Sequence, residues 1–300
     1  TSDHMYVSGG NSSSRKNLTV MKKEQIDDFT KLNVDFENFD LDIRTSDDDH
    51  YYMEYKLEKN GRKNPLTWKD KDGELTLEES AGGSGSYYIT YDLGIFSTHA
   101  DLTEKKDALN TVILYIPEKA QLSEAELQLS DGDLTADQLL CKEMTLELLN
   151  GDLMLDKGEF EKFDAKLSDG DLNVKELQCT DNMQLKSGNG DVTIKKAELA
   201  DGQIALSDGD LQIDNGSFNG DMKINSSCGD VSVEMKNGSV EKTNIYLKAA
   251  DGDVDTEGLS RGKSDNEEDT SVYENKASAS APTLNVKCSD GDITLTESEK

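Results

Sequence analysis

The sequence is poor in positive charge, in aromatic residues and in long apolar runs. Its 300 residues include 32 Lys and Arg against 62 Asp and Glu, so the formal net charge is −30. Binding to nucleic acid or to anionic lipid needs clustered basic side chains, so this balance argues against both partners. No run of residues approaches the roughly 20 apolar positions that a transmembrane helix needs. With 34% hydrophobic and 6% aromatic residues, only a regular repeat gives such a chain a continuous core.

Proline is also scarce, with three residues at Pro65, Pro117 and Pro282. Proline cannot donate a backbone hydrogen bond, so its scarcity suits a fold in which nearly every strand is paired on both edges.

A short phrase, Ser-Asp-Gly-Asp followed by an aliphatic residue, recurs along the second half of the chain. Its final Asp is separated from the next by 19, 19, 20, 19, 20, 23 and 39 residues, and it stands at Asp133, Asp152, Asp171, Asp191, Asp210, Asp230, Asp253 and Asp292. A period this constant is the signature of a repeat architecture. The long last interval contains an acidic, Ser-rich stretch, which we interpret as an insertion loop over 258–281.

Apolar residues alternate with polar ones on both sides of the Gly in each phrase. Positions eight, six and four before the final Asp and one and three after it are mostly aliphatic, as with Leu134, Leu153 and Leu172. Period-two alternation predicts strands with one buried face, joined at a sharp Asp-Gly corner. A unit of this size buries its inner face only by stacking on its neighbours. We therefore predict an all-β fold, a single-stranded β-solenoid (β-helix) with rungs of about 19–20 residues, over 119–296.

The first part of the chain is less regular. The opening Thr-Ser-Asp-His-Met resembles a remnant of cloning, and we assign 1–24 to this remnant and a flexible linker. Residues 25–118, including expected strands at Tyr87–Tyr91 and Thr111–Ile116, read as degenerate rungs that cap one end of the stack. In this interpretation Asp72-Gly73 is a degenerate copy of the corner phrase. A separate small β-domain is the alternative.

The four cysteines are best interpreted as small core residues. Cys141 and Cys179 share one inward column and lie two rungs apart, about 9–10 Å, which is too far for a disulfide. Cys288 occupies a core column, and Cys228 replaces a corner Asp. Without a Cys-x-x-Cys or a His pair, the sequence offers no zinc site. His50 and His99 are interpreted as loop residues, with no nucleophile signature nearby, and Trp68, the single tryptophan, lies near Pro65.

Stacking places the corner aspartates in files with about 4.8 Å between neighbours. The plainer hypothesis is that each carboxylate accepts backbone N–H groups at its own corner, with Asn diluting the charge. The alternative is Ca²⁺ held between rungs, since hard cations take clustered carboxylate oxygens. Its candidate ligands are Asp131, Asp133, Asp152, Asp169, Asp171, Asp191, Asp208 and Asp210. We assign no catalytic residue and no other cofactor.

A polysaccharide-active β-helix enzyme is a weaker alternative. Glycoside hydrolysis needs two carboxyl groups in contrasting environments, whereas these acids recur uniformly at every corner. A surface this negative would also repel an anionic polymer.

The repeated phrase resembles the bacterial putative-adhesin family of unknown function (domain of unknown function 4097), whose members include LiaG-like envelope proteins. The resemblance extends to Phe29–Val34, Thr45–Asp48, Asp72–Leu77 and Ile116-Pro117, so it covers nearly all of 25–296. It implies an extracytoplasmic β-solenoid at the bacterial surface, often tethered by an N-terminal membrane segment and associated with envelope stress. It implies no catalytic residues.

We therefore expect a non-enzymatic, acidic, monomeric envelope rod that adheres, spaces or senses. Its partner would be an envelope protein or a surface ligand, with a membrane tether before residue 1. The alternative is a calcium-stabilised module that binds a partner protein.

Overall fold

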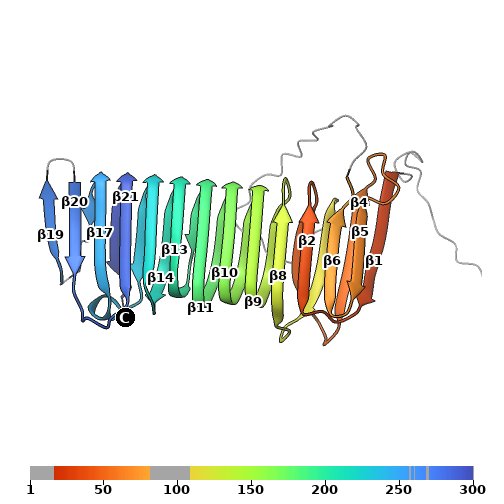
Figure 1. The fold of residues 1–300 in the computed structure, drawn as a ribbon, viewed down its shortest axis with the longest axis horizontal. Coiled ribbons are helices and arrows are strands. Elements are labelled where there is room, and N and C mark those ends of the chain that lie inside the picture. The colour runs from red at the N-terminus through yellow and green to blue at the C-terminus, as the bar shows by residue number, and fades with distance from the viewer. Residues whose placement is uncertain (1–16, 82–108, 257, 260, 268–269, 300) are drawn as a thin grey trace, which may run out of the picture.

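The computed structural model describes residues 17–81, 109–256, 258–259, 261–267 and 270–299. These residues are mostly β-strand, with a short 3-10 turn, η2 (Val240–Lys242). The predicted all-β class is therefore confirmed. Figure 1 shows the strands side by side along one axis, with β1 (Leu18–Ile26) at one end and β19 (Lys263–Glu267) at the other. The expected strand at Tyr87–Tyr91 lies outside the described residues.

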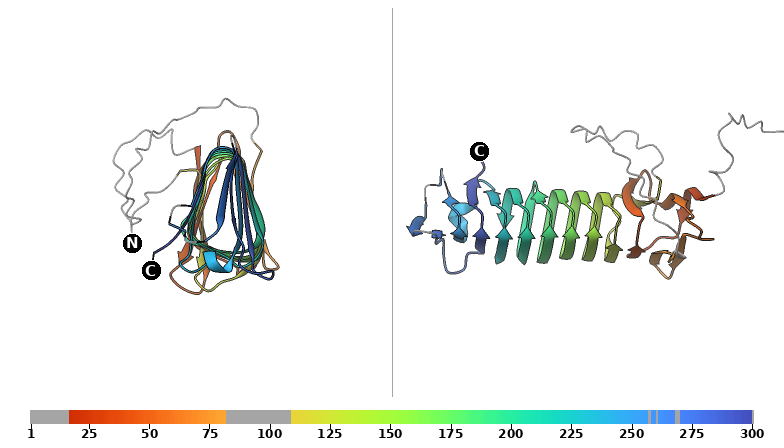
Figure 2. Two further views of the ribbon diagram at one scale, coloured as in Figure 1. Left: turned by 90° about the vertical axis from the view of Figure 1, so that its left-hand side faces the viewer. Right: turned by 90° about the horizontal axis from the view of Figure 1, so that it is seen from above.

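The regular part consists of coils that stack with parallel pairing. We call one repeat a coil. The strands that precede the corner Asp of each coil form the pre-corner face of the stack, and the strands that follow it form the post-corner face. Leu153 lies opposite both Leu134 and Leu172, as the period predicts. Viewed down the axis, the coils superimpose (Figure 2). The strands are β8 (Leu122–Leu129), β9 (Leu134–Asn150), β10 (Leu153–Asp169), β11 (Leu172–Asn189), β12 (Val192–Ile194), β13 (Ala197–Asp208), β14 (Leu211–Phe218), β15 (Met222–Cys228) and β16 (Val231–Met235).

The core is a set of aliphatic columns that run along the stack. Leu134, Leu153 and Leu172 are each at most 2% exposed, and the residues between the inward positions face solvent. Burying one such side chain contributes about 1.5–3 kcal/mol. Because each column continues from coil to coil, the inner face of every coil is covered by its neighbours.

Glycine is required at the corners because the coils approach one another closely there. Gly190 has a φ of +133°, and a Cβ atom added to it would lie 2.1 Å from the carbonyl oxygen of Gly170. The same clash recurs at the corresponding Gly209 and Gly229, each with the preceding corner Gly. The corner Gly therefore supplies both the backbone conformation and the space for the next coil.

The N-terminal end contains a coil that is out of sequence order. β2 (Lys31–Phe36) pairs in parallel with β6 (Glu74–Glu79) and β8, and β3 (Asp40–Ser46) pairs in parallel with β7 (Thr111–Pro117) and β9. The first coil of the chain therefore lies inside the stack.

Antiparallel strands close this end. β4 (Tyr51–Glu58) pairs with β7 and β1, and β5 (Leu66–Lys71) pairs with β6. Two expectations are corrected here. Residues 18–24, assigned to the linker, form most of β1, because the edge of β4 offers them backbone partners. Asp72-Gly73 is not a coil corner: with φ of +56° and +78°, it joins the β5–β6 hairpin, the positive pair that a type I′ turn needs.

A buried ion pair replaces the corner phrase in the first coil. Arg62 Nη1 lies 3.0 Å from Glu79 Oε1, with the two side chains 8% and 1% exposed. Glu79 Oε2 accepts the backbone N–H groups of Glu37, Asn38 and Phe39 at 2.9, 2.6 and 3.2 Å. This carboxylate thus fixes the turn between β2 and β3.

The C-terminal coil is also out of order. β21 (Thr283–Asp290) lies between β15 and β17 (Asn244–Asp251), and β22 (Ile293–Glu297) lies between β16 and β18 (Val254–Asp255). The corner order is therefore Asp230, Asp292, Asp253. The repeat pattern does not specify this order, because equivalent columns give either order the same inward contacts.

The predicted insertion loop 258–281 contains regular structure. Within it, β19 and β20 (Thr270–Asn275) form an antiparallel hairpin, and β20 also pairs antiparallel with β17. The hairpin continues the pre-corner face by two strands, since β17 would otherwise leave an edge without backbone partners.

Candidate functional site

The corner aspartates form a continuous hydrogen-bonded ladder. The Oδ1 atom of each accepts the backbone N–H of the corner Asp in the next coil, as Asp152 does from Asp171 at 2.8 Å. The eight bonds measure 2.8–2.9 Å and join Asp40, Asp133, Asp152, Asp171, Asp191, Asp210, Asp230, Asp292 and Asp253 in that order. The carboxylates therefore accept hydrogen bonds from the next coil. The sequence analysis had predicted acceptance at each residue's own corner, and that prediction was wrong.

A second file runs two residues before the ladder. Asn150 Nδ2 donates to Asp131 Oδ1 at 2.7 Å, and Asn189 Nδ2 donates to Asp169 Oδ1 at 2.6 Å. Asp208 continues the file next to Asn189. The Asn side chains thus separate carboxylates that would otherwise face one another at about 4.8 Å, where two unit charges repel by about 0.9 kcal/mol in water.

The candidate calcium ligands therefore lie at one corner of the stack, divided between the two files. In seven of the eight, all except Asp208, one carboxylate oxygen already accepts an N–H group. Among the described residues, no group of three or more Asp, Glu, His or Cys side chains is arranged to hold a metal ion. The geometry supports a structural role for the ladder, and calcium binding remains the alternative.

The cysteines are unpaired, and three of the four are buried. Cys141 and Cys179 lie on either side of Phe160 in one column, and burial raises the pKa of their thiols to about 12 and about 11. Cys288 is also buried, whereas Cys228 is exposed, so the core assignment was wrong for this residue. Cys228 follows Asp208 in the second file, where side chains point outward.

His50 is exposed, as expected for a loop residue, and Trp68 is an exposed residue of β5. His99 lies outside the described residues. Neither described residue gathers with a nucleophile or a metal ligand in the structure as described.

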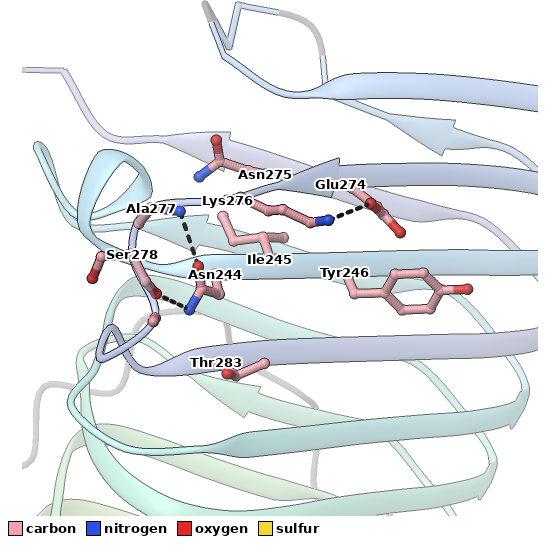
Figure 3. Close-up of a pocket in the computed structure, with 10 residues that line it drawn as sticks. Asn244, Ile245, Tyr246, Glu274, Asn275, Lys276, Ala277, Ser278 and Thr283 are labelled. Carbon is pink, nitrogen blue, oxygen red and sulfur yellow. Dashed lines mark hydrogen bonds and ion pairs between the residues drawn. The ribbon is translucent and has the colours of Figure 1, made fainter.

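A groove lies on the outer surface near the C-terminal end, between β20, β17 and β21 (Figure 3). Its volume is about 490 Å³. Tyr246 and Asn244 on β17, Glu274 on β20, Thr283 on β21 and the connection that begins at Lys276 line it. One sequence signal pointed to this site: Tyr246 is the aromatic member of an outward column that otherwise holds polar residues.

The wall of the groove is fixed by Asn244. Its Nδ2 donates to the carbonyl oxygens of Ser278 and Ala281 at 2.7 and 3.1 Å, and its Oδ1 accepts the N–H of Ala277 at 2.9 Å. Across the groove, Lys276 Nζ lies 3.9 Å from Glu274 Oε2. The groove therefore has a rigid wall and one loosely paired acid and base.

A family comparison fits this architecture. The family described as Toastrack DUF4097 matches residues 29–296. The chain belongs to this family. The family match covers both out-of-order coils, the Asp ladder and the groove. No match was found among curated proteins. Among the described residues, no helix has the length and apolar character needed to cross a membrane.

Solved structures that match this chain include proteins with adhesin names. A putative adhesin from Parabacteroides merdae gives a TM-score of 0.52 at 15% identity, with 94% of this chain and 97% of that chain covered. A putative adhesin from Parabacteroides distasonis gives 0.48 at 15% identity, with the same coverage. A putative cell adhesion protein from Clostridium sporogenes gives 0.27 at 16% identity, with 93% and 100% covered. The first of these likenesses shows a common fold.

Proposed function

We propose that this Toastrack protein is a non-enzymatic β-solenoid rod of the bacterial cell surface, with an adhesin-like role. The observation that carries the proposal is the unbroken Asp ladder, which joins nine coils through main-chain N–H groups. Each carboxylate is used to hold the next coil, which is the task of a scaffold. The adhesin names of similar structures support the same role.

The dimensions suit a spacer. On the pre-corner face, twelve successive pairings lead from β5 to β19. At about 4.8 Å per strand, this face is about 58 Å long. The net charge of −30 favours a soluble, monomeric surface.

We also propose an orientation on the cell. β1 lies at one end of the stack and the β19–β20 hairpin at the other (Figure 1). A membrane tether that preceded residue 1 would hold the β1 end near the membrane. The hairpin and the groove beside it would then be the parts farthest from the cell.

Surface exposure can be tested through Cys228, the exposed thiol. Intact cells that express the full native gene are treated with a membrane-impermeant maleimide before lysis. We expect labelling of the wild type and none of Cys228→Ser, because the other three thiols are buried. Labelling of Cys228 only after lysis would contradict an extracytoplasmic location.

A further inference from the structure

We propose that the groove beside β17 binds a neutral saccharide. This proposal rests on the adhesin-like role proposed above and adds a class of ligand to it. The groove of about 490 Å³ lies within the roughly 300–1,000 Å³ range of small-molecule sites. Another recess, over Phe163 on the same face, holds about 230 Å³.

The groove arises where the regular stacking ends. Successive regular coils pair in parallel on this face, whereas β20 runs antiparallel to β17. The chain must then cross from the end of β20 back to β21, and this connection passes the start of β17 beside Asn244 (Figure 3). The three hydrogen bonds of Asn244 hold the connection in place. A wall that is already ordered lowers the entropy cost of binding.

Both edges of β17 are occupied, which limits the kind of ligand. One edge pairs with β21 over Asn244–Asp251, and the other pairs with β20 over Ile245–Ala249. A peptide that binds by strand addition needs an open edge. A ligand in this groove must therefore be recognised by side chains.

The side chains that remain suit hydroxyl groups. Glu274 is an acceptor and Lys276 a donor, with 49% and 87% of their side chains exposed, and Thr283 offers a hydroxyl that can do both. The half-buried ring of Tyr246 offers an electron-rich face to the C–H groups of a sugar ring.

The charge of the groove favours a neutral ligand. Glu274 and Lys276 cancel each other, while the whole chain carries −30. An acidic polymer would be repelled by the whole protein, and a cation would find no net negative charge from the paired Glu274 and Lys276 within the groove. A neutral, hydroxyl-rich ring satisfies both conditions.

The experiment titrates the purified full chain with maltotriose, mannotriose, galactotriose and N,N′,N″-triacetylchitotriose, using saturation-transfer NMR and calorimetry. Trigalacturonic acid is the anionic comparison. We expect saturable binding of at least one neutral trisaccharide and none of trigalacturonic acid. We expect Tyr246→Ala to weaken it about tenfold or more, which corresponds to about 1.4 kcal/mol. Tyr52→Ala, a half-buried tyrosine at the other end of the stack, is the matched control and should bind like the wild type.

Thermal melting verifies that the variants fold. The double variant Glu274→Gln, Lys276→Met provides a second binding test that leaves Tyr246 in place. Binding that survives in both groove variants would overturn the proposal, and so would binding of trigalacturonic acid alone or of none of the neutral sugars. The maleimide experiment on intact cells is independent of this result. A surface-labelled protein that binds no neutral sugar would therefore refute the ligand and leave the surface role standing.

Discussion

The Asp ladder makes a quantitative prediction at Asp171. Its Oδ1 atom accepts the backbone N–H of Asp191 at 2.8 Å, in the middle of the regular coils. Asp171→Ala removes this acceptor. A hydrogen bond to a charged group contributes about 1.5–3 kcal/mol, and exposure at the corner lets water replace part of it. Removing the carboxylate also relieves part of its repulsion from Asp152 and Asp191, so we expect a net loss of about 1 kcal/mol in the free energy of unfolding.

Asp171→Asn separates the hydrogen bond from the charge. The amide oxygen can still accept the N–H of Asp191, although a neutral acceptor is weaker. Removing the charge also relieves repulsion from the carboxylates of Asp152 and Asp191, about 0.9 kcal/mol each in water at 4.8 Å. The two effects oppose each other, so we expect Asp171→Asn to differ from the wild type by less than about 1 kcal/mol.

The assay is urea unfolding followed by circular dichroism, with Asp164→Ala as the matched control. Asp164 is an exposed acid on an outward column of β10, the strand that leads into the Asp171 corner, and it lies outside both files. It should change stability by no more than about 0.5 kcal/mol. If Asp171→Ala were as stable as Asp164→Ala, or if Asp171→Asn were as unstable as Asp171→Ala, the ladder would not stabilise the stack in the way argued here.

Three further predictions follow from the same geometry. Gly190→Ala should lower the free energy of unfolding by more than about 3 kcal/mol or prevent folding, because its Cβ would overlap the Gly170 carbonyl oxygen. Gly61→Ala, which has open space around it at a φ of +80°, should lower it by only about 1–2 kcal/mol. Urea unfolding compares the two variants. Titration with a thiol reagent should modify one thiol, Cys228, in the native protein and four after denaturation, and fast modification of a second native thiol would contradict the burial described. Millimolar Ca²⁺ should leave the melting temperature within about 1 °C, equivalent to less than about 0.5 kcal/mol, because the ladder oxygens already accept N–H groups; a rise of several degrees would restore the calcium hypothesis.

The repeat made the interior of the stack predictable. A two-residue period on each side of an Asp-Gly corner determines which residues face inward, so the burial of Leu153 and the column of Cys141, Phe160 and Cys179 followed from counting. The dilution of charge by Asn150 also followed, because it shares a register position with the acids. These features depend on position within a coil, which the period determines.

The order of the coils could not be predicted in this way. The position of a residue within a coil determines whether it faces inward, but not which coil lies next to it. Val254 and Ile293 are therefore equally suited to pack beside Val231. The direction of the ladder bonds was missed for a related reason, since a carboxylate at a corner can reach either its own backbone or that of the next coil. The groove depends on the path of the connection after β20, which the sequence pattern does not specify.

Insertion of both terminal coils has a consequence for the ends of the stack. The first coil is covered by β6 and β7, and the last by β17 and β18. The first and last coils of the chain therefore each have a neighbouring coil on both sides. The outermost strands β1, β5 and β19 pair antiparallel with their neighbours. Charged residues such as Lys22, Lys69 and Asp265 lie on these edges, where they discourage pairing with another chain.

The most direct test of this account is to cross-link Cys228 to an introduced cysteine. In the structure Cys228 lies opposite Asp290, and Asp251 is one coil farther away. Adjacent Cα atoms, at about 4.8 Å, are within disulfide range, whereas two coils, at about 9.6 Å, exceed it. Mild oxidation should therefore produce an intramolecular disulfide in Asp290→Cys and none in Asp251→Cys, as read by peptide mass. A disulfide in Asp251→Cys alone would mean that the coils stack in sequence order, contrary to the arrangement described.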